Sequence, residues 1–521
     1  MTFTPYGQSG DQIEQLMLLS MWANFLGKQQ STHTQLSQKM LFAGLGRPTY
    51  PINRHTVSAY QCYWERMDSL AKHWHDNPMI GDDGCAIGYG DPYGDECAKE
   101  MMAHAMSAWY DSEVVAKNVL FTVGGIGGLR IIFDVLNSLY AKYGKYRIIT
   151  PFPHYSAYTN NPHHLLHPIE VMTEPGYQLT ADLLEKSIQK AYLLAENDGI
   201  TPKAVLLCNP SNPLGTIIKE EELKKIVQVL RQYSDLHLIF DEAYAEMNFK
   251  EIPSFLKLAP DLKRRTIIMR SATKALSAAG ERMAVLLAFD DFLMNELVRQ
   301  QIVSYIHPPR SAQIAYAETM FHFNREDRKA MSSFYHTKVQ YVIKRLKDMG
   351  AQMPCAHYEV DATFYALGDF SDLMGMEIPN GVEKALNKTG IVQTGEELAY
   401  SLLFNDSIML APLSFFGMPE DCGYLRITCS AKSDELQEMM DRLESRLFEA
   451  RLLKNQFLVS EIRFEIDNLS DEHHPSKEKI TQRLENIQLT KQNCYQLKEQ
   501  NNQLRHLLNL LVDSSIANEI V

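Results

Sequence analysis

Short β-rich runs alternate with helical stretches from about residue 118 onwards, and no other feature of the sequence restricts the fold as strongly. The runs that are predicted as strands cover residues 118–122, 147–150, 204–208, 236–240 and 266–269. Such alternation predicts an α/β fold in which helices cover both faces of a mostly parallel sheet. Ligands bind beyond the carboxyl ends of the strands in sheets of this kind, so the residues after each run are candidates for a functional site.

The pattern changes after residue 310. Long helices are predicted over about 311–349, and shorter β runs near 364–367, 407–410 and 424–428 follow them. This order indicates a second, smaller α+β domain. We therefore predict four segments: an N-terminal arm that is part of the small domain, a large domain, the small domain proper and a helical extension, over residues 1–60, 61–310, 311–449 and 450–521.

Two further helical segments carry recognisable patterns. Apolar positions fall on one face of a predicted helix over residues 11–28, which we interpret as a packing element. They are Ile13, Leu16, Met17, Leu19 and Leu26. In the extension, residues recur every seven positions along two seams. The first seam is Ile480, Ile487, Cys494, Asn501 and Leu508, and the second is Arg483, Thr490, Leu497, Leu504 and Leu511.

An asparagine in such a seam, here Asn501, is the kind of residue that fixes the register of a coiled coil. Two interpretations of the extension therefore stay open. It forms either a self-association or partner helix, or a helix that folds back on the body of its own chain.

Composition limits the classes of partner. A chain of 521 residues can form two or more packed units and enclose a deep pocket. The formal net charge is −13 and no segment concentrates Lys and Arg, which argues against nucleic acid and against an anionic membrane surface. No apolar run approaches the roughly 20 residues that span a bilayer, and the N-terminus lacks the pattern of a secretory signal. We expect a soluble cytoplasmic protein that acts on small molecules.

Metal and disulfide chemistry is not predicted. The eight cysteines are scattered without metal-ligand spacing, as expected of reduced thiols in a cytosol. Two histidine groups lack matching acidic or cysteine partners, so we predict no metal site. They are His163, His164 and His167, and the pair His473 and His474.

Polar residues follow the predicted strands. Asp241 and Tyr244 come directly after the run 236–240, although a single aspartate there can equally cap a helix or form an ion pair. The run 204–208 leads into NPSNPLG at 209–215, whose prolines and glycine fix the backbone and hold Asn212 rigidly.

The run 266–269 leads into a hydroxyl, an amine and a guanidinium, those of Ser271, Lys274 and Arg282. Lysines of lowered pKa form Schiff bases, and arginine binds phosphate through two parallel hydrogen bonds, so this set suits a phosphorylated aldehyde.

Two other strand ends complete the candidate site. A glycine-rich turn at 123–128 precedes an apolar helix that is expected from Leu129, and the amides at a helix start attract phosphate; close packing of helix on strand is the rival interpretation. Tyr155 follows the run 147–150 and offers an aromatic face for a flat ring, unless it is a core residue.

Together these motifs resemble the class I/II aminotransferase family of fold type I pyridoxal-phosphate (PLP) enzymes, over roughly residues 40–445. The resemblance is carried by NPSNPLG at 209–215, DEAY at 241–244 and SATKALSAAGER at 271–282, in the family's order and with its usual spacings. It implies a PLP-dependent transferase fold, with a seven-stranded sheet in the large domain, and PLP as cofactor.

The resemblance also implies roles for individual residues. Lys274 would hold PLP as a Schiff base and later move a proton at the substrate α-carbon, and Asp241 would keep the ring nitrogen protonated. Asn212 and Tyr244 would hold the phenolic oxygen of the ring. Tyr155 would stack on the ring, and Ser271, Arg282 and the amides of Gly125 and Ile126 would bind the phosphate.

Three residues are implied on the substrate or subunit side. Arg426, in the run 424–428, resembles the arginine that grips the α-carboxylate, with a surface ion pair as the alternative. Gly46 lies in a stretch, 44–48, that resembles the substrate-side N-terminal loop, and Asn212 is expected near the substrate as well. Tyr89 resembles the tyrosine that reaches the phosphate of the neighbouring subunit, which implies a homodimer.

The sequence departs from the family pattern at two places. Ala284 stands where a glycine is common, without loss of a functional group. Members for dicarboxylic substrates carry an arginine upstream of a Pro-Pro pair, and Ile302 occupies that position before Pro308 and Pro309. This departure disfavours aspartate as a substrate.

We therefore predict an aminotransferase that moves an amino group between an amino acid and a 2-oxo acid. One alternative is a PLP-dependent lyase or synthase that performs β- or γ-elimination or cyclisation, because cofactor motifs do not separate these reactions. Another is a catalytically vestigial interaction protein that uses the helical extension. The intact polar set argues against the last alternative, and the sequence names neither the amino donor nor the acceptor.

Overall fold

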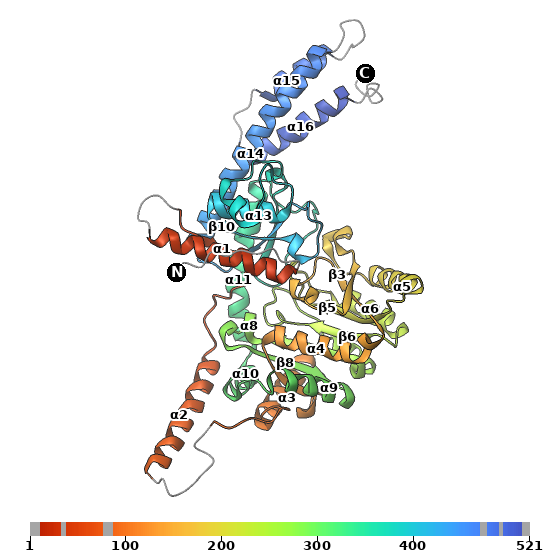
Figure 1. Cartoon of the computed structure of the whole chain (residues 1–521), viewed down its shortest axis with the longest axis vertical. Helices are drawn as coiled ribbons and strands as arrows, with labels where there is room; N and C mark the ends of the chain where they lie inside the picture. Colours follow the sequence, from red (N-terminus) through yellow and green to blue (C-terminus); the bar gives the residue numbers. More distant parts are fainter. Residues whose placement is uncertain (1–10, 33–37, 77–86, 469–476, 489–492, 513–521) are drawn as a thin grey trace.

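A computed structural model describes residues 11–32, 38–76, 87–468, 477–488 and 493–512. A seven-stranded sheet forms the centre of its lower body (Figure 1). One strand is antiparallel to both of its neighbours and the other pairs are parallel. In spatial order the strands are β2 (Val119–Val123), β8 (Met283–Ala288), β7 (Thr266–Ser271), β6 (His237–Asp241), β5 (Pro202–Cys208), β3 (Tyr146–Pro151) and β4 (His164–Ile169).

Helices bury both faces of this sheet, as the predicted α/β fold class requires. Alternate residues of β5 point to opposite faces: Val205 and Leu207 join one apolar cluster, and Ala204 and Leu206 join the other. Helices α5 (Ala181–Asp198) and α6 (Glu220–Gln232) contribute to the first cluster, and α4 (Gly124–Tyr140) and α9 (Asp291–Tyr305) to the second. The predicted fold class is confirmed, and β4 and β8 are additional strands that the pattern of runs did not reveal.

A smaller antiparallel sheet lies above the large one and is built from β9 (Tyr365–Asp369), β12 (Tyr424–Thr428) and β11 (Ala411–Pro412). The run predicted at 407–410 forms β10 (Ile408–Met409), which pairs in parallel with β1 (Leu41–Phe42) instead of joining that sheet. The long helices that were predicted over 311–349 are α10 (Arg310–His322) and α11 (Arg325–Asp348).

Helix α1 (Gln12–Thr32) crosses the molecule between the two sheets (Figure 1). It contacts η4 (Ser156–Thr159) of the larger body and η10 (Leu413–Phe416) beside the smaller sheet. Helix α2 (Arg54–Asp76) packs on α10 and then projects from the lower end of the molecule in Figure 1. The N-terminal segment therefore reaches both parts of the fold.

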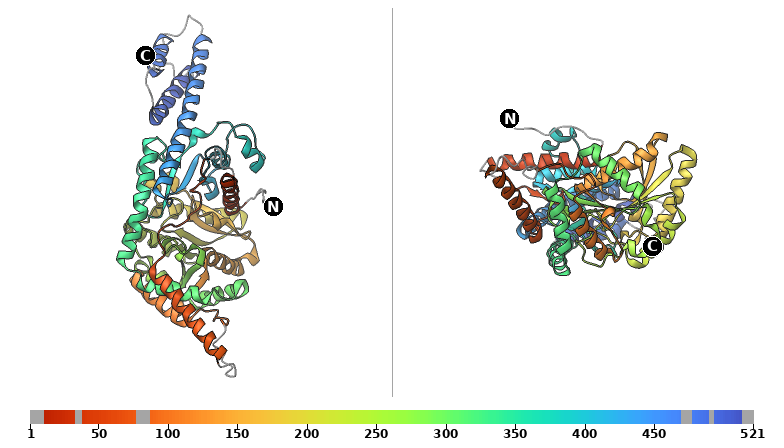
Figure 2. Two further views of the ribbon diagram at one scale, coloured as in Figure 1. Left: turned by 90° about the vertical axis from the view of Figure 1, so that its left-hand side faces the viewer. Right: turned by 90° about the horizontal axis from the view of Figure 1, so that it is seen from below.

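The helical extension projects from the top of the molecule (Figures 1 and 2). It begins inside the long helix α14 (Ser433–Asn468) and continues with α15 (Lys477–Gln488) and α16 (Cys494–Val512). Helix α16 packs on α14 of the same chain, and a shared apolar cluster joins the three helices. Its buried members are Leu458, Ile462, Ile466, Ile480, Leu484, Leu504, Leu507 and Leu511.

Asn501 of the heptad pattern is buried and donates a hydrogen bond to the side-chain oxygen of Asn455 on α14, at 2.8 Å. Of the two interpretations of the extension, the described residues therefore show the second, in which the helix folds back on its own chain. Thr490, His473 and His474 lie outside the described residues.

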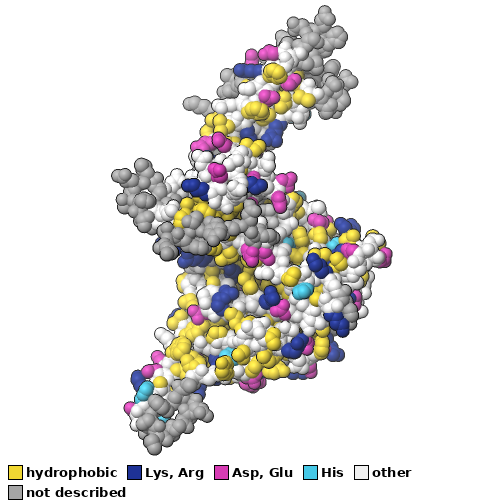
Figure 3. Space-filling view, in the orientation of Figure 1, with side chains coloured by type: hydrophobic (Ala, Val, Ile, Leu, Met, Phe, Trp, Pro, Cys, Tyr) yellow, Lys and Arg dark blue, Asp and Glu magenta, His cyan; other side chains and the backbone are white. Residues whose placement is uncertain are grey.

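Charged side chains of both signs are scattered over the face that Figure 3 shows, without a stripe of Lys and Arg. No helix in the described part of the chain is both long and apolar enough to cross a bilayer.

Candidate active site

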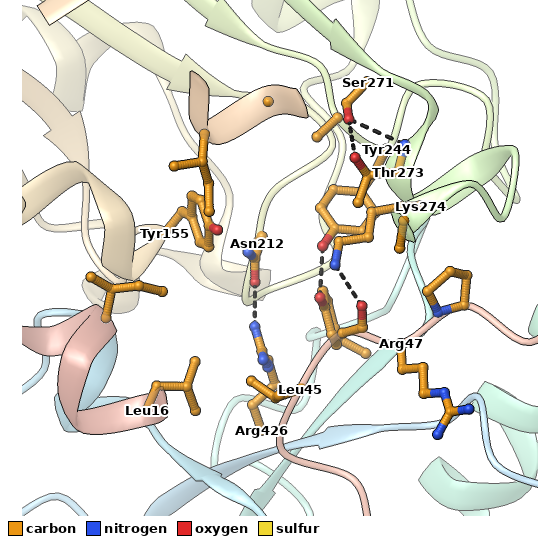
Figure 4. A pocket seen from close by; sticks show the side chains of 18 of the residues that line it. Leu16, Leu45, Arg47, Tyr155, Asn212, Tyr244, Ser271, Thr273, Lys274 and Arg426 are labelled. Atoms are coloured by element: carbon orange, nitrogen blue, oxygen red, sulfur yellow. Dashed lines mark hydrogen bonds between the residues drawn. The ribbon is translucent and has the colours of Figure 1, made fainter. Parts of the chain in front are cut away.

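A cavity of about 470 Å³ lies at the carboxyl ends of β5, β6 and β7, where α1 and the smaller sheet approach the larger one (Figure 4). Parallel strands bring residues that are distant in sequence to this edge. Nearly all of the predicted site residues line the cavity: Gly46, Gly125, Ile126, Tyr155, Asn212, Asp241, Tyr244, Ser271, Lys274, Arg282 and Arg426.

Tyr89 is the predicted site residue that does not line this cavity. Its side chain is 85% exposed, and its ring meets that of His307 edge-on, with 6.2 Å between the ring centroids. Within its own chain Tyr89 therefore has no access to the site.

Lys274 lies on α8 (Ala272–Ala275), directly after β7. Its ammonium nitrogen Nζ donates a hydrogen bond to the backbone oxygen of Gly46 at 2.5 Å. Burial, together with the guanidinium groups of Arg426 and Arg282, lowers the pKa of Lys274 to about 8. Near neutral pH this amine is neutral far more often than an exposed lysine.

Asp241 is the last residue of β6 and is buried at the floor of the cavity. The Tyr158 hydroxyl donates to its Oδ2 at 2.7 Å and the amide of Ala243 donates to its Oδ1 at 3.1 Å. Burial raises the pKa of Asp241 to about 6, and these two hydrogen bonds limit the rise. The carboxylate is therefore ionised at pH 7 and prepared to accept a hydrogen bond from a cationic or N–H group.

Arg426, on β12, faces the cavity from the smaller sheet. Its Nη1 donates to Asn212 Oδ1 at 2.8 Å and its Nη2 donates to the backbone oxygen of Gly44 at 2.6 Å. The guanidinium carbon lies 4.1 Å from the ring centroid of Tyr365 and 4.5 Å from that of Phe416. Because Arg426 is buried, the surface ion pair considered as its alternative role is excluded.

Tyr244 and Tyr365 share a hydrogen bond between their hydroxyl oxygens at 2.6 Å, and burial raises the pKa of both phenols. The hydroxyl of Tyr365 also explains the glycine at position 46. A Cβ at Gly46 would lie only 2.0 Å from this oxygen, so the loop can pass here only with a glycine.

The glycine-rich segment differs from its prediction. Helix α4 begins at Gly124 and not near Leu129, so the glycines form its first turn. Gly124 has a φ of +68°, and a Cβ there would lie 2.5 Å from Nη2 of Arg282. Among the described residues no side chain caps this helix start, and Gly125, Ile126 and Arg282 all line the cavity.

Residues 58–443 match the model of the family described as aminotransferase class I and II. The chain belongs to this family. Its relatives among curated proteins include the aspartate aminotransferase of Pyrococcus abyssi, which is 25% identical over 293 residues, 55% of this chain and 65% of that protein. The aromatic-amino-acid aminotransferase 2 of Thermococcus litoralis is 26% identical over 296 residues, 55% of this chain and 66% of that protein. The chain thus matches slightly less than two thirds of the length of these relatives.

The fold of this family member is also similar to solved structures. The aspartate aminotransferase from Rhizobium meliloti superposes with a TM-score of 0.64 at 17% sequence identity, and the match covers 84% of this chain and 98% of that one. At this identity the similarity establishes the fold.

Two sets of residues in this class I/II aminotransferase escaped the sequence prediction. Tyr158 contacts Asp241 and Tyr365 contacts Arg426. Tyr158 lies in the same segment as Tyr155 but was given no role, and Tyr365 belongs to no motif. Helix α1, interpreted as a packing element, also forms a wall of the cavity. The residues of α1 that line it are Ile13, Leu16, Met17, Ser20 and Asn24.

The cavity of this family member fits PLP, the cofactor implied by the family. One end offers the unpaired amides of a helix start beside Arg282 and the Ser271 hydroxyl, which suits a phosphate. Lys274 supplies a buried amine for the aldehyde, and Asp241 supplies a buried carboxylate for the ring nitrogen. No group of three or more His, Cys, Asp and Glu side chains that could hold a metal ion occurs among the described residues.

Proposed function

We propose that this protein is a PLP-dependent aminotransferase that moves an amino group between an amino acid and a 2-oxo acid. The observation that carries the proposal is the buried amine of Lys274, with a pKa of about 8, in one cavity with the buried carboxylate of Asp241 and the guanidinium of Arg426. When bound, PLP withdraws electrons from the α-carbon of an attached amino acid.

Separate groups of cavity residues would hold the aldehyde, the ring and the phosphate of the cofactor. Lys274 would bind its aldehyde carbon covalently and Asp241 would pair with its ring nitrogen. Asn212 and Tyr244 would hold its ring oxygen, and Tyr155 would stack on its ring. Ser271, Arg282 and the amides of Gly125 and Ile126 would bind its phosphate.

Substrate handling would fall to Arg426 and Lys274. Arg426 is held in place by Asn212, Gly44 and two aromatic rings, and its Nε has no hydrogen-bond partner among the described residues. A substrate carboxylate would supply a charged partner for this guanidinium. The Lys274 amine, with a pKa near the working pH, is suited to remove the α-proton and return it.

The proposed enzyme is a cytoplasmic homodimer in which Tyr89 reaches the phosphate of the partner subunit. The exposure of Tyr89, and its position outside the cavity of its own chain, support this arrangement. The proposed domain division keeps the seven-stranded sheet within 61–310 and the three-stranded sheet within 311–449. The pairing of β1 with β10 supports an N-terminal arm that is part of the small domain.

Borohydride reduction of the PLP-loaded protein, followed by peptide mapping, tests the proposal. We expect a single stable adduct at Lys274, and none in Lys274→Ala. In a separate sample that has not been reduced, addition of an amino acid alone should convert the cofactor to its amine form with release of one equivalent of 2-oxo acid. Release of ammonia would instead indicate a lyase, and absence of the adduct would indicate a vestigial site.

A further inference from the structure

Apolar side chains predominate on one wall of the cavity, although Ser20 and Asn24 of α1 line it as well. Helix α1 contributes Leu16 and Met17, the segment around β1 contributes Phe42 and Leu45, and Leu129 and Met409 come from α4 and β10. Figure 4 shows Leu16 and Leu45 beside the Asn212–Arg426 pair. A substrate whose carboxylate rests on Arg426 would direct its side chain toward such neighbours.

Cationic groups for a second carboxylate are lacking on this wall. The described residues that line the cavity include four cations: Arg47, Lys274, Arg282 and Arg426. The last three serve the cofactor and the α-carboxylate under the proposed function. Arg47 is exposed, and Figure 4 places it on the other side of the cavity from Leu16. An ionised side-chain carboxylate against the apolar wall would lose its hydration without a compensating cation.

We propose that α1 is the specificity wall of the enzyme, and that its substrates are amino acids with apolar or aromatic side chains. This inference rests on the proposed function and adds the substrate class. The wall is a fixed part of the fold, because Leu19, Trp22 and Ala23 on the neighbouring face of α1 are fully buried in the main core.

Two methionines of α1 give a matched pair of variants. Met17 lines the cavity and is 47% exposed, whereas Met21, one helical turn later, is 40% exposed and does not line it. The experiment measures kcat/KM of the PLP-loaded full chain for leucine, methionine, phenylalanine and tyrosine against aspartate and glutamate. For the unmodified enzyme we expect a preference of about 100-fold for the apolar group, since a buried carboxylate would stay unpaired.

Met17→Arg introduces a cation at the wall. It should raise kcat/KM for aspartate and lower it for leucine, so that the preference falls by about 10-fold or more. Met21→Arg should leave both values unchanged. Met17→Ala and Met21→Ala provide a second pair without a new charge, and only Met17→Ala should weaken turnover of large apolar substrates.

A preference of the unmodified enzyme for acidic amino acids would overturn the inference, most directly if Arg47→Gln abolished that preference. Equal responses of the Met17 and Met21 variants would overturn it as well. Borohydride trapping at Lys274 distinguishes failure of the proposed function from failure of the inferred substrate class. A missing adduct refutes the proposed function, whereas a trapped adduct with acidic preference refutes only the substrate class.

Discussion

Lys274 illustrates how burial and charge combine at a single residue. Its nitrogen is enclosed by protein, and Arg426 and Arg282 add positive potential, so the neutral amine is favoured. The same two guanidinium groups face sites for anions. Under the proposed function, one pair of cations would therefore both activate the amine and bind the charged groups of the ligands.

A pH dependence follows from this arrangement. Only the neutral amine attacks an aldehyde, so the rate at which the apoprotein forms its adduct with PLP should rise with pH, with a midpoint near 8, and level off above it. Arg426→Gln removes a cation that lowers the pKa of Lys274 and should shift the midpoint upward. Stopped-flow absorbance of the adduct measures the rate. A midpoint near 10 in the unmodified protein would contradict the prediction.

Tyr365 offers a test of a contact that the sequence did not predict. Tyr365→Phe keeps the ring against Arg426 but removes the hydrogen bond to Tyr244, and we expect turnover to fall about 3- to 10-fold, as for one neutral hydrogen bond. Tyr316→Phe is a matched control. Tyr316 is also buried, but its hydroxyl has no hydrogen-bond partner among the described residues, so turnover should not change. Equal rates for both variants would contradict the prediction.

Residues were predictable from sequence when they directly follow a strand of the large sheet. Asp241, Asn212 and Lys274 meet because the carboxyl ends of parallel strands share one edge, which is a local property of the pattern. Tyr365 reaches the same cavity from a separate sheet. Its position depends on long-range packing, and within the apolar segment around Phe364 nothing distinguishes it from a core aromatic residue.

Helices, like single residues, were predictable from sequence only where local sequence determines them and not where long-range packing does. The start of α4 was placed too late, because consecutive glycines are poor helix formers by propensity and the sequence favoured a turn. At Gly124 the structure requires a glycine, because φ is +68° and a Cβ would lie 2.5 Å from Nη2 of Arg282. Helix α1 was predicted as an element, but its cavity-lining role depends on where it docks.

The docking of α1 depends on Trp22. The centroid of its ring lies 5.7 Å from the ring centroid of Phe25 and 5.7 Å from that of Phe404 on α13 (Gly395–Asp406). Trp22→Ala should remove about 3–5 kcal/mol of packing and loosen α1 locally. We expect faster hydrogen exchange over 12–32 and a higher KM, with the Lys274 adduct retained. Trp64→Ala, at a position of α2 that is 51% exposed, should leave both unchanged. Unaltered exchange in Trp22→Ala would show that α1 docks independently of this side chain.

At the scale of the whole molecule, the extension is a structural continuation of the smaller body. Its heptad pattern was compatible with pairing between chains or within one chain, because a seam of apolar residues specifies a partner surface and not the partner's origin. The chain itself supplies that surface: α14 continues beyond the body and presents Leu458, Ile462 and Ile466 to α16. Pairing within one chain carries the lower entropic cost.

Arg451 links this extension to the body and makes their coupling testable. Its side chain is fully buried on α14, where it donates to Asp372 Oδ2 at 2.7 Å and to the backbone oxygens of Gly350 at 3.1 Å and Cys494 at 2.9 Å. Arg451→Ala should lower the free energy of unfolding by about 3–5 kcal/mol, because it leaves a carboxylate and carbonyl groups without their partner.

Arg446→Ala provides the comparison on the same helix. Arg446 also binds a carboxylate, that of Asp406, but its side chain is 29% exposed and, among the described residues, its hydrogen bonds go to carboxylates alone, so the expected cost is smaller, about 1–3 kcal/mol. Urea unfolding, monitored by circular dichroism, measures the free energy of unfolding of both variants. A single transition that shifts strongly only in Arg451→Ala would show that extension and body unfold together. Equal small shifts would show instead that the extension folds independently, and that the contacts of Arg451 contribute little to the stability of the body.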